Sequence, residues 1–276
     1  MTRTVDLESL NRRTARRHVV SGSMFHREIA ALDWRLHELD AVVDDFVLVE
    51  SILTHSGKPN RPGRPDLDPR FAYAWGRLHV AVIEDPPRDP DPWIRESGQR
   101  AAIWSKGCAK LDLGDDTLVI VSDLDEVPFP EIVDRLAYSE FNEPIHVRPH
   151  WFNFDWSNYL GAWDHASIHF YTAGYLRRLF TNGRAGAFGY RSIPGLEVPG
   201  LHGWHASWFG DSDMILDKLA SYSHAADKRD VVAAAEGREG IQRRRSSGGD
   251  IFGGRQRQEP RPRLPRHAGR MPGNTP

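Results

Sequence analysis

The chain contains a short apolar run, Leu118–Val121, that is followed within five residues by three carboxylates. Consecutive apolar residues without polar alternation are typical of a strand that is buried on both faces. Such strands occur in parallel sheets that are covered by helices on both sides. In these sheets ligands bind just beyond the carboxyl ends of the strands, where the acids lie. The run therefore predicts an α/β protein with a binding site at this end of the sheet.

The acids that follow the run are Asp123, Asp125 and Glu126. Asp123 and Asp125 are two residues apart, so in an extended chain their side chains would leave from the same side. Two hard oxygen ligands suit Mn²⁺ or Mg²⁺, which needs few protein ligands when a diphosphate supplies the rest. The alternative is that the acids begin a helix near Pro128, since Asp and Glu favour first helical turns. We favour the metal site because one carboxylate would suffice for a cap.

Two earlier apolar runs, Phe46–Val49 and Leu78–Ile83, also read as buried strands that end in acids. Apolar positions at helical spacing predict a helix between residues 24 and 39 and another between residues 93 and 111. Strands that alternate with helices indicate βαβ units and a mainly parallel sheet. Right-handed crossovers would bring the acids of three strands to one edge of that sheet. These acids are Glu50, Glu84, Asp85, Asp123 and Asp125.

The second half of the chain has a different pattern. Residues 145–156 and 166–171 alternate like antiparallel strands, and five of the nine Trp lie between residues 151 and 208. Aromatic rings stack on the apolar faces of sugar rings, so a cleft lined by Trp suits a glycan. The alternative is that each Trp fills the core, as large aromatic residues usually do. Trp151 and Trp204 are the better binding candidates because their neighbours include His150, His202 and His205.

Both ends of the chain differ in composition from its middle. Residues 1–20 are polar and Arg-rich, and we expect them to be loosely ordered. Residues 231–276 carry ten Arg and four acids with many Gly and Pro, which predicts a flexible tail. Residues 21–230 would then form one catalytic domain. The rest of the chain, outside the tail, has 26 basic and 34 acidic residues, which disfavours a nucleic-acid partner.

The single cysteine, Cys108, excludes an internal disulfide and reads as a small buried residue. No apolar run approaches the length of a membrane span. The basic residues near the N-terminus resemble the start of a signal peptide, but the apolar region that should follow is missing. We therefore expect a cytoplasmic protein without an integral membrane segment.

Several segments, in this order and spacing, together resemble glycosyltransferase family 17, whose animal members include the β-1,4-mannosyl-glycoprotein 4-β-N-acetylglucosaminyltransferases. The resemblance covers about residues 24–224, and a fainter likeness reaches residues 248–253. Its most specific parts are the Thr-His-Ser-Gly-Lys-Pro, Ser-Asp-Leu-Asp-Glu and Gly-Trp-His-Ala-Ser stretches. The segments are Phe46–Glu50, Thr54–Pro59, Glu96 with Gln99–Arg100, Ser122–Glu126, Gly203–Trp208 and Lys218–His224.

The resemblance implies a glycosyltransferase fold of the nucleotide-binding A type, with a smaller antiparallel region on the acceptor side. It also implies a UDP-sugar donor, which for the animal enzymes is UDP-N-acetylglucosamine, a glycan acceptor, and inversion at the anomeric carbon. The Asp123-Leu-Asp125 stretch would hold Mn²⁺ or Mg²⁺ against the donor diphosphate and neutralise the leaving UDP. One departure from the family is Phe25-His-Arg-Glu28, where the second acid of the family's first element is missing.

Other residues receive roles on chemical grounds. His205 is a candidate third metal ligand, because imidazole ligates Mn²⁺. Glu50 could hold the uridine or ribose, and the phosphates could contact His55, Lys58 or Arg100. For His55 and Arg100 the alternatives are a loop hydrogen bond and a surface ion pair. An inverting transfer also needs a base for the acceptor hydroxyl. The candidate bases are Asp155, Glu126, Asp164 and Asp211, with Asp155 preferred for its aromatic neighbours.

Three other functions remain to be weighed. A carbohydrate-binding pseudoenzyme of the same fold is the main alternative, although the retained pair of acids argues against it. A metal-dependent nucleotidyltransferase or phosphatase could also use a carboxylate cluster, but a phosphatase with an aspartyl nucleophile would carry its acids on the first strand. An NTPase is disfavoured because no Gly-x-x-x-x-Gly-Lys loop is present.

Overall fold

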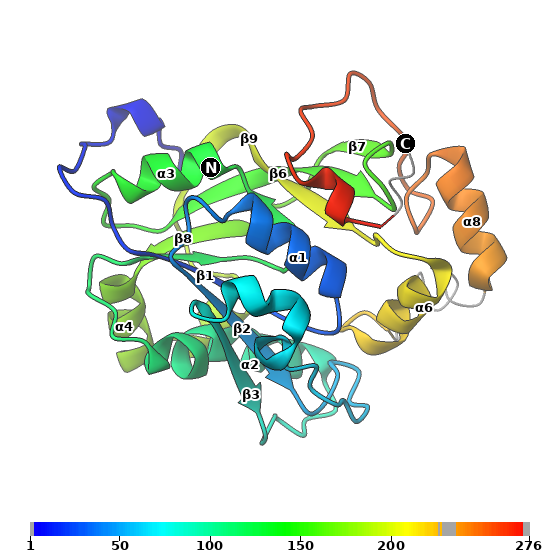
Figure 1. The fold of residues 1–276 in the computed structure, drawn as a ribbon, viewed down its shortest axis with the longest axis horizontal. Helices are drawn as coiled ribbons and strands as arrows, with labels where there is room; N and C mark the ends of the chain where they lie inside the picture. Colours follow the sequence, from blue (N-terminus) through cyan, green and yellow to red (C-terminus); the bar gives the residue numbers. More distant parts are fainter. Residues whose placement is uncertain (1–2, 226, 228–235, 273–276) are drawn as a thin grey trace.

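The computed structural model describes residues 3–225, 227 and 236–272 (Figure 1). Within these residues nine strands form one sheet in the order β3-β2-β1-β4-β8-β6-β9-β5, with β7 paired to β6. The strands are β1 Val19–Met24, β2 Asp45–Ser51, β3 Leu78–Ile83, β4 Leu118–Val121, β5 Glu126–Pro128, β6 Ile145–Asn153, β7 Tyr159–Ala162, β8 Ile168–Thr172 and β9 Leu196–Ser207. The main helices are α1 Ile29–Glu38, α2 Pro92–Ala102, α3 Pro130–Ala137, α4 Ala173–Thr181, α5 Ala185–Gly189, α6 Ser212–Ser221 and α8 Gly237–Ser247.

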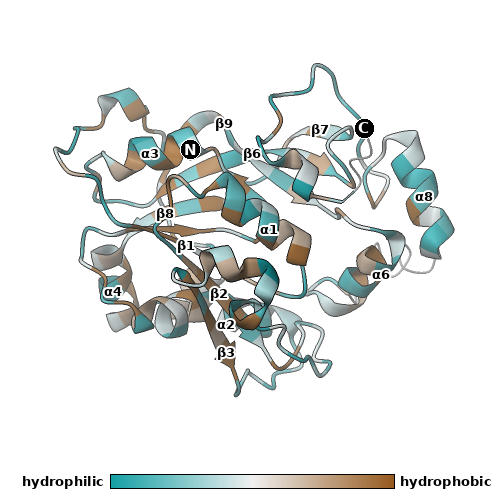
Figure 2. Cartoon of the chain, in the orientation of Figure 1, coloured by the Kyte–Doolittle hydropathy of each residue, from teal (hydrophilic) through white to brown (hydrophobic). Residues whose placement is uncertain are grey.

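Strands β3, β2, β1 and β4 run parallel to one another. Alternate residues of β4 belong to two different cores: Leu118 and Ile120 pack with α1 and α3, whereas Val119 and Val121 pack with α2, α4 and α5. This explains the uninterrupted apolar run, because both faces of the strand exclude water. Figure 2 shows the same concentration of hydrophobic residues along these strands. The expected α/β fold, with a parallel sheet and helices on both faces, is confirmed.

The other half of the sheet is mixed. Strand β8 pairs antiparallel with β4 and with β6, and β7 pairs antiparallel with β6. Strand β9 runs parallel to β6 and antiparallel to β5. The expected antiparallel strands are therefore present, but they extend the central sheet instead of forming a separate region.

The segment before residue 21 differs from the expectation of loose order. Leu7–Ser9 forms a 3₁₀ helix, and β1 begins at Val19. The Arg17 side chain is 3% exposed and donates hydrogen bonds to the carbonyl oxygens of Asp116 and Ser139. The arginines of this segment thus bind the folded body, and β1 lies in the middle of the sheet.

The Arg-rich tail also differs from the expectation of flexibility. Its described part, residues 236–272, contains α8 and the buried side chains of Ile251 and Met271. The indole N–H of Trp156 donates to the carbonyl oxygen of Ala268 at 3.0 Å, and that of Trp204 donates to Arg263 at 2.9 Å. The tail therefore packs on the body. Residues 231–235 and 273–276 of the predicted tail lie outside the described residues.

None of the helices in the described part of the chain is both long enough and apolar enough to cross a membrane.

Candidate active site

A cavity of about 1170 Å³ lies at the carboxyl ends of the parallel strands. It is lined by residues 24–28 after β1, by Ser51 and residues 53–55 after β2, and by residues 123–125 after β4. The parallel strands bring these loops to one edge of the sheet, as expected, but Glu84 and Asp85 do not line the cavity. The position is the usual one for a ligand in an open α/β sheet.

The loop that carries the acids is a turn between β4 and β5. The Glu126 backbone N–H donates to the Asp123 carbonyl oxygen at 3.0 Å, and the Asp123 N–H donates to the Glu126 carboxylate at 3.1 Å. The helix α3 begins at Pro130 after Phe129, and no side chain caps it. The capping alternative is therefore wrong. The expectation that Asp123 and Asp125 share one side of an extended chain is also wrong, because the chain turns between them.

Arg35 of α1 supports this turn from below and is 1% exposed. Its guanidinium donates to the carbonyl oxygens of Asp123 at 3.1 Å and Glu126 at 2.9 Å. It also donates to the hydroxyls of Ser21 and Ser122 at 2.9 Å and 3.1 Å. Burial lowers the pKa of Arg35 to about 10, so the group stays charged at neutral pH. The acid loop is thus held by a buried cation.

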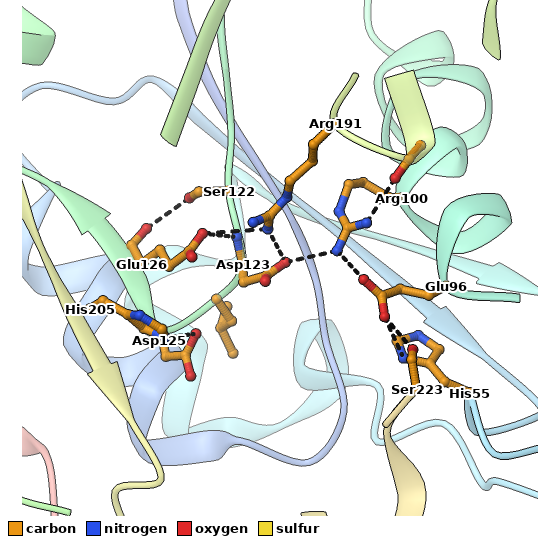
Figure 3. A network of polar contacts seen from close by, with 12 residues as sticks. His55, Glu96, Arg100, Ser122, Asp123, Asp125, Glu126, Arg191, His205 and Ser223 are labelled. Carbon is orange, nitrogen blue, oxygen red and sulfur yellow. Dashed lines mark hydrogen bonds and ion pairs between the residues drawn. The ribbon is translucent and has the colours of Figure 1, made fainter. Parts of the chain in front are cut away.

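The Asp123 carboxylate lies between two arginines, as Figure 3 shows. Arg191 pairs with its Oδ1, and Arg100 Nη2 lies 3.3 Å from the same atom. Burial disfavours the charged carboxylate, but Arg191 and Arg100 outweigh it and hold the pKa of Asp123 below its ordinary value. Arg191 also lies 3.4 Å from the buried Glu126, and Arg100 donates to Glu96 at 2.6 Å.

Asp125 faces a different set of partners. Its Oδ2 accepts a hydrogen bond from Lys218 Nζ at 3.0 Å, and Lys218 also binds Glu28 at 2.7 Å. Its Oδ1 lies 3.8 Å from His205 Nε2, and Figure 3 shows the two side chains directed at each other. Burial raises the pKa of Glu28, and the nearby Lys218 only partly opposes this shift. Burial alone would lower the pKa of Lys218, but the carboxylates of Asp125 and Glu28 raise it.

We call this set of groups the charged floor: seven of them line the cavity, whereas Arg35 and Glu126 are buried and do not line it. The charged floor consists of Glu28, Arg35, Glu96, Arg100, Asp123, Asp125, Glu126, Arg191 and Lys218.

Of the three predicted metal ligands, Asp125 and His205 are placed so that they could hold an ion together. Carboxylate oxygen and imidazole nitrogen are donors that Mn²⁺ accepts, and Asp125 and His205 present them to each other. The Nδ1 atom of His205 is buried and has no hydrogen-bond partner among the described residues. Asp123 fits less well, because Arg191 and Arg100 both hold its Oδ1 atom. Across the described residues, no group of three His, Cys, Asp or Glu side chains is arranged to hold an ion.

Of the residues predicted to bind the donor, His55, Arg100, Asp123 and Trp151 line the cavity. His55 Nε2 donates a hydrogen bond to the Gln99 amide oxygen at 2.9 Å, and burial lowers the pKa of His55. Trp151 lies with its indole N–H 2.6 Å from Ser207 and its ring 4.8 Å from that of Trp163.

Glu50, Lys58 and Trp204 do not line the cavity, and their predicted contact with the donor is corrected. Glu50 is 1% exposed, and its carboxylate accepts the backbone N–H groups of Gly63 at 2.6 Å and Arg64 at 2.9 Å. It therefore organises a loop. The Lys58 side chain is exposed at the surface, while Trp204 is 1% exposed and packs in the core.

The two preferred base candidates are likewise outside the cavity. Asp155 accepts hydrogen bonds from the Ser157 backbone N–H at 2.8 Å and its hydroxyl at 2.5 Å, so it closes a turn. Glu126 is 1% exposed and bound to Arg191. Of the other two candidates, Asp211 caps α6, whereas Asp164 lines the cavity with a side chain that is 56% exposed.

Three cations of the charged floor, Arg35, Lys218 and Arg191, had no predicted role. Lys218 lies in a segment that carries the family resemblance, so its position was available as a signal. Arg191 follows α5 in a stretch without a motif, and its backbone adopts a left-handed φ of 53°. This conformation is strained for a residue with a side chain and is often retained at functional sites.

Comparison with known proteins supports the family assignment. A profile of glycosyltransferase family 17 matches residues 1–254. The chain belongs to this family. The resemblance seen in the sequence is thereby confirmed, and the match includes all of α8 and the residues that follow it as far as residue 254.

The β-1,4-mannosyl-glycoprotein 4-β-N-acetylglucosaminyltransferases of Rattus norvegicus and Homo sapiens are both 31% identical to the family 17 chain over 157 residues. The matched region covers 54% of this chain, but only 29% of the rat enzyme and 30% of the human enzyme. The chain therefore spans less than a third of the length of these relatives.

Among solved structures, the mannosyltransferase PcManGT from Pyrobaculum calidifontis, in complex with GDP-Man and Mn²⁺, aligns with a TM-score of 0.46 at 12% identity. The alignment covers 86% of this chain and 67% of that one. A 4-diphosphocytidyl-2C-methyl-D-erythritol synthase aligns with a TM-score of 0.40 at 14% identity, over 70% of this chain and 90% of that one.

Proposed function

We propose that the protein transfers N-acetylglucosamine from a UDP-sugar to a glycan acceptor, with inversion and with the help of Mn²⁺ or Mg²⁺. The observation that carries this proposal is the charged floor, which lies in a large cavity at the carboxyl ends of β1, β2 and β4. The family membership and the names of the relatives agree with it.

The charge of the floor supports metal dependence. It contains four cationic side chains and five carboxylates, so it offers no excess of positive charge to a diphosphate. A diphosphate that enters the cavity would meet a floor that is neutral at best, even if Glu28 is protonated. A divalent ion held by Asp125 and His205 would reverse this balance and neutralise charge on the leaving UDP.

Arg100 and Arg191 are the side chains best placed to contact the diphosphate. Both line the cavity, and the Nε atom of each is buried without a hydrogen-bond partner among the described residues. Guanidinium groups bind phosphate oxygens through paired N–H donors. The two arginines now share the Asp123 carboxylate, so a phosphate would compete with Asp123 for them.

The acceptor side of the cavity is aromatic. Trp151 and Trp163 pack edge to face with ring centres 4.8 Å apart, and both line the cavity. Asp164 follows directly and pairs with Arg255 of the tail. We propose that a sugar of the acceptor stacks here and that Asp164 takes the proton of the attacking hydroxyl.

The alternative is a pseudoenzyme that binds a nucleotide sugar or a glycan without turnover. The observation that favours it is that Arg191 and Arg100 both hold the Oδ1 atom of Asp123, which opposes binding of a metal ion at that oxygen.

The test is UDP release from UDP-N-acetylglucosamine with Mn²⁺ and a panel of glycan acceptors. We expect release by the wild type and loss of release in Asp125→Asn. Asp213→Asn is the matched control, because Asp213 lies on α6 with a 62% exposed side chain paired to Arg238. Binding without UDP release by the wild type would support the pseudoenzyme, and absence of both would contradict the proposal.

A further inference from the structure

One part of the cavity wall carries polar atoms that bind nothing within the protein. Ser167 and His169, at the start of β8, are 1% and 4% exposed, and both line the cavity. In the part of the chain that the structure describes, Ser167 Oγ and His169 Nε2 have no hydrogen-bond partner. His146 of β6 stands directly opposite His169, with ring centres 4.3 Å apart, and its Nε2 is also unpartnered there. We call these three residues the histidine pocket.

The histidine pocket is uncharged. Burial holds the pKa of His169 well below its ordinary value, and burial lowers the pKa of His146 to about 4. Both imidazoles are therefore neutral at physiological pH. A neutral pocket with hydrogen-bonding atoms suits an uncharged polar group, such as a hydroxyl or an amide, better than it suits a phosphate.

The opposite ring nitrogen of His169 lies near a neighbouring hydroxyl. The Tyr171 hydroxyl lies 3.4 Å from His169 Nδ1, and burial raises the pKa of this tyrosine, so the hydroxyl keeps its proton. A neutral imidazole has one donor and one acceptor nitrogen, so His169 Nε2 donates to or accepts from an uncharged group in the cavity according to the tautomer. Ser167 adds a hydroxyl, which can donate and accept.

The pocket adjoins the charged floor. His169 pairs with Val121 across β4 and β8, and Asp123 follows Val121 by two residues. Arg191, Arg100 and Asp123 are close enough to influence the pKa of His169. A group attached to a diphosphate at the floor therefore has the histidine pocket within reach. On the other side of the pocket, the backbone of Gly195 packs against the ring of His146. A Cβ atom at position 195 would lie only 2.5 Å from His146 Nε2.

From these contacts we infer that the histidine pocket binds the transferred sugar of the donor through an uncharged oxygen, such as the acetamido carbonyl or a hydroxyl. This inference rests on the proposed function and deepens it. His169 and Ser167 distinguish a nucleotide sugar from the nucleotide alone, because they contact the sugar and not the diphosphate.

The test compares two dissociation constants, for UDP-N-acetylglucosamine and for UDP, measured by titration calorimetry with Mn²⁺. In His169→Phe and Ser167→Ala we expect the constant for the nucleotide sugar to rise about five- to tenfold. The constant for UDP should stay the same. The control is His150→Phe, because His150 is a half-buried histidine of β6 that bonds Tyr159 and lies outside the cavity.

An equal loss of affinity for both ligands, or no loss for either, would overturn the inference. If the wild type binds UDP but gains nothing from the sugar, the pocket assignment fails while the nucleotide site stands. If the wild type binds neither ligand, the proposed function fails, and the inference with it. Should His169→Phe not fold, as judged by circular dichroism, the smaller change Ser167→Ala decides the outcome.

Discussion

The charged floor and the histidine pocket belong to one cavity, but the carboxylates of the floor are paired with cations, whereas polar atoms of the pocket are unpaired within the described part of the chain. At the floor, Asp123 and Asp125 each have a cationic partner, and the cations are shared among several carboxylates. In the histidine pocket, Ser167 and His169 present buried atoms that the described residues leave unpaired. Buried polar atoms normally find partners, so the contrast separates groups that hold the fold from groups that await a ligand.

The comparison also explains what each region can bind. A floor of balanced charges holds its own geometry, and an anion can enter only by displacing an internal partner or by bringing a cation with it. The histidine pocket needs no displacement and no counter-ion. A nucleotide sugar combines an anionic diphosphate with a neutral polyol, and the two regions together match these two parts.

The largest expected effect concerns Arg35, the buried cation under the floor. In Arg35→Met the carbonyl oxygens of Asp123 and Glu126 lose their donor, and the carboxylates above lose a compensating charge. We expect the free energy of unfolding in urea to fall by about 3–5 kcal/mol. Arg238→Ala, which breaks an exposed pair with Asp213, should cost less than about 1 kcal/mol. Equal losses in the two variants would refute the supporting role of Arg35.

The next effect concerns Asp125, which we propose as a ligand of the metal ion. With Asp125→Asn we expect UDP release to fall by about 10²–10³-fold, since stabilisation of the leaving group would be lost. The fold should persist, because Lys218 keeps Glu28 as a partner. A steady-state assay across Mn²⁺ concentrations checks this. Recovery of the full rate at high Mn²⁺ would mean that Asp125 only assists binding of the ion.

A third prediction uses the pKa of Asp123, which Arg191 and Arg100 hold low in spite of burial. Because its folded pKa lies below the unfolded value of about 3.9, Asp123 contributes stability above that pH. This contribution disappears as the pH falls through the folded pKa. The stability difference between wild type and Arg191→Met should therefore be largest above pH of about 4 and shrink toward lower pH. A difference that grows on acidification would contradict the ion pair.

The smallest effect comes from two buried serines. Ser122, 2% exposed, donates to the Glu126 carbonyl at 2.7 Å and accepts from Arg35, whereas Ser167 has no partner among the described residues. Ser122→Ala should cost about 1–3 kcal/mol, and Ser167→Ala should cost nothing or stabilise the fold slightly. Thermal unfolding of both variants measures the difference. A destabilised Ser167→Ala would show that its hydroxyl serves the fold.

The parallel half of the sheet could be predicted from sequence because its strands are buried on both faces. The run at Leu118–Val121 matches β4 in both bounds, and the run at Leu78–Ile83 matches β3. Strand β1 was missed because it contains Ser21, Gly22 and Ser23 instead of large apolar residues. The structure explains the glycine. A Cβ atom at position 22 would lie 2.3 Å from a side-chain carbon of Ile103, so the residue that follows α2 leaves no room for a side chain there.

The tail was missed because its composition suggests flexibility, while its order depends on distant partners. Arg255 pairs with Asp164, Arg263 with Glu131 at 3.0 Å, and Arg270 with Asp33 at 2.6 Å. The opposite net charges of the tail and the remaining chain were visible, but no local pattern shows which acid meets which arginine.

The sequence predicted where the candidate site lies, but it did not predict which side chains contact one another there. The acids after β4 marked the correct loop, but their contacts with Arg191, Lys218 and Arg35 join segments far apart in the chain. Glu50 and Trp204 illustrate the opposite error. Each has a chemically suitable side chain beside the right segment, yet backbone groups of Gly63, Arg64 and Arg263 use its polar atoms.

The central claim is that the balanced floor accepts a diphosphate only together with a divalent cation. The direct measurement is the dissociation constant of UDP-N-acetylglucosamine for the wild-type protein, titrated once with Mn²⁺ and once with EDTA. We predict binding with Mn²⁺ and at least about a hundredfold weaker binding with EDTA, since the floor alone has no positive excess. Equal affinity under both conditions would show that Arg100 and Arg191 hold the diphosphate unaided, and it would contradict the claim.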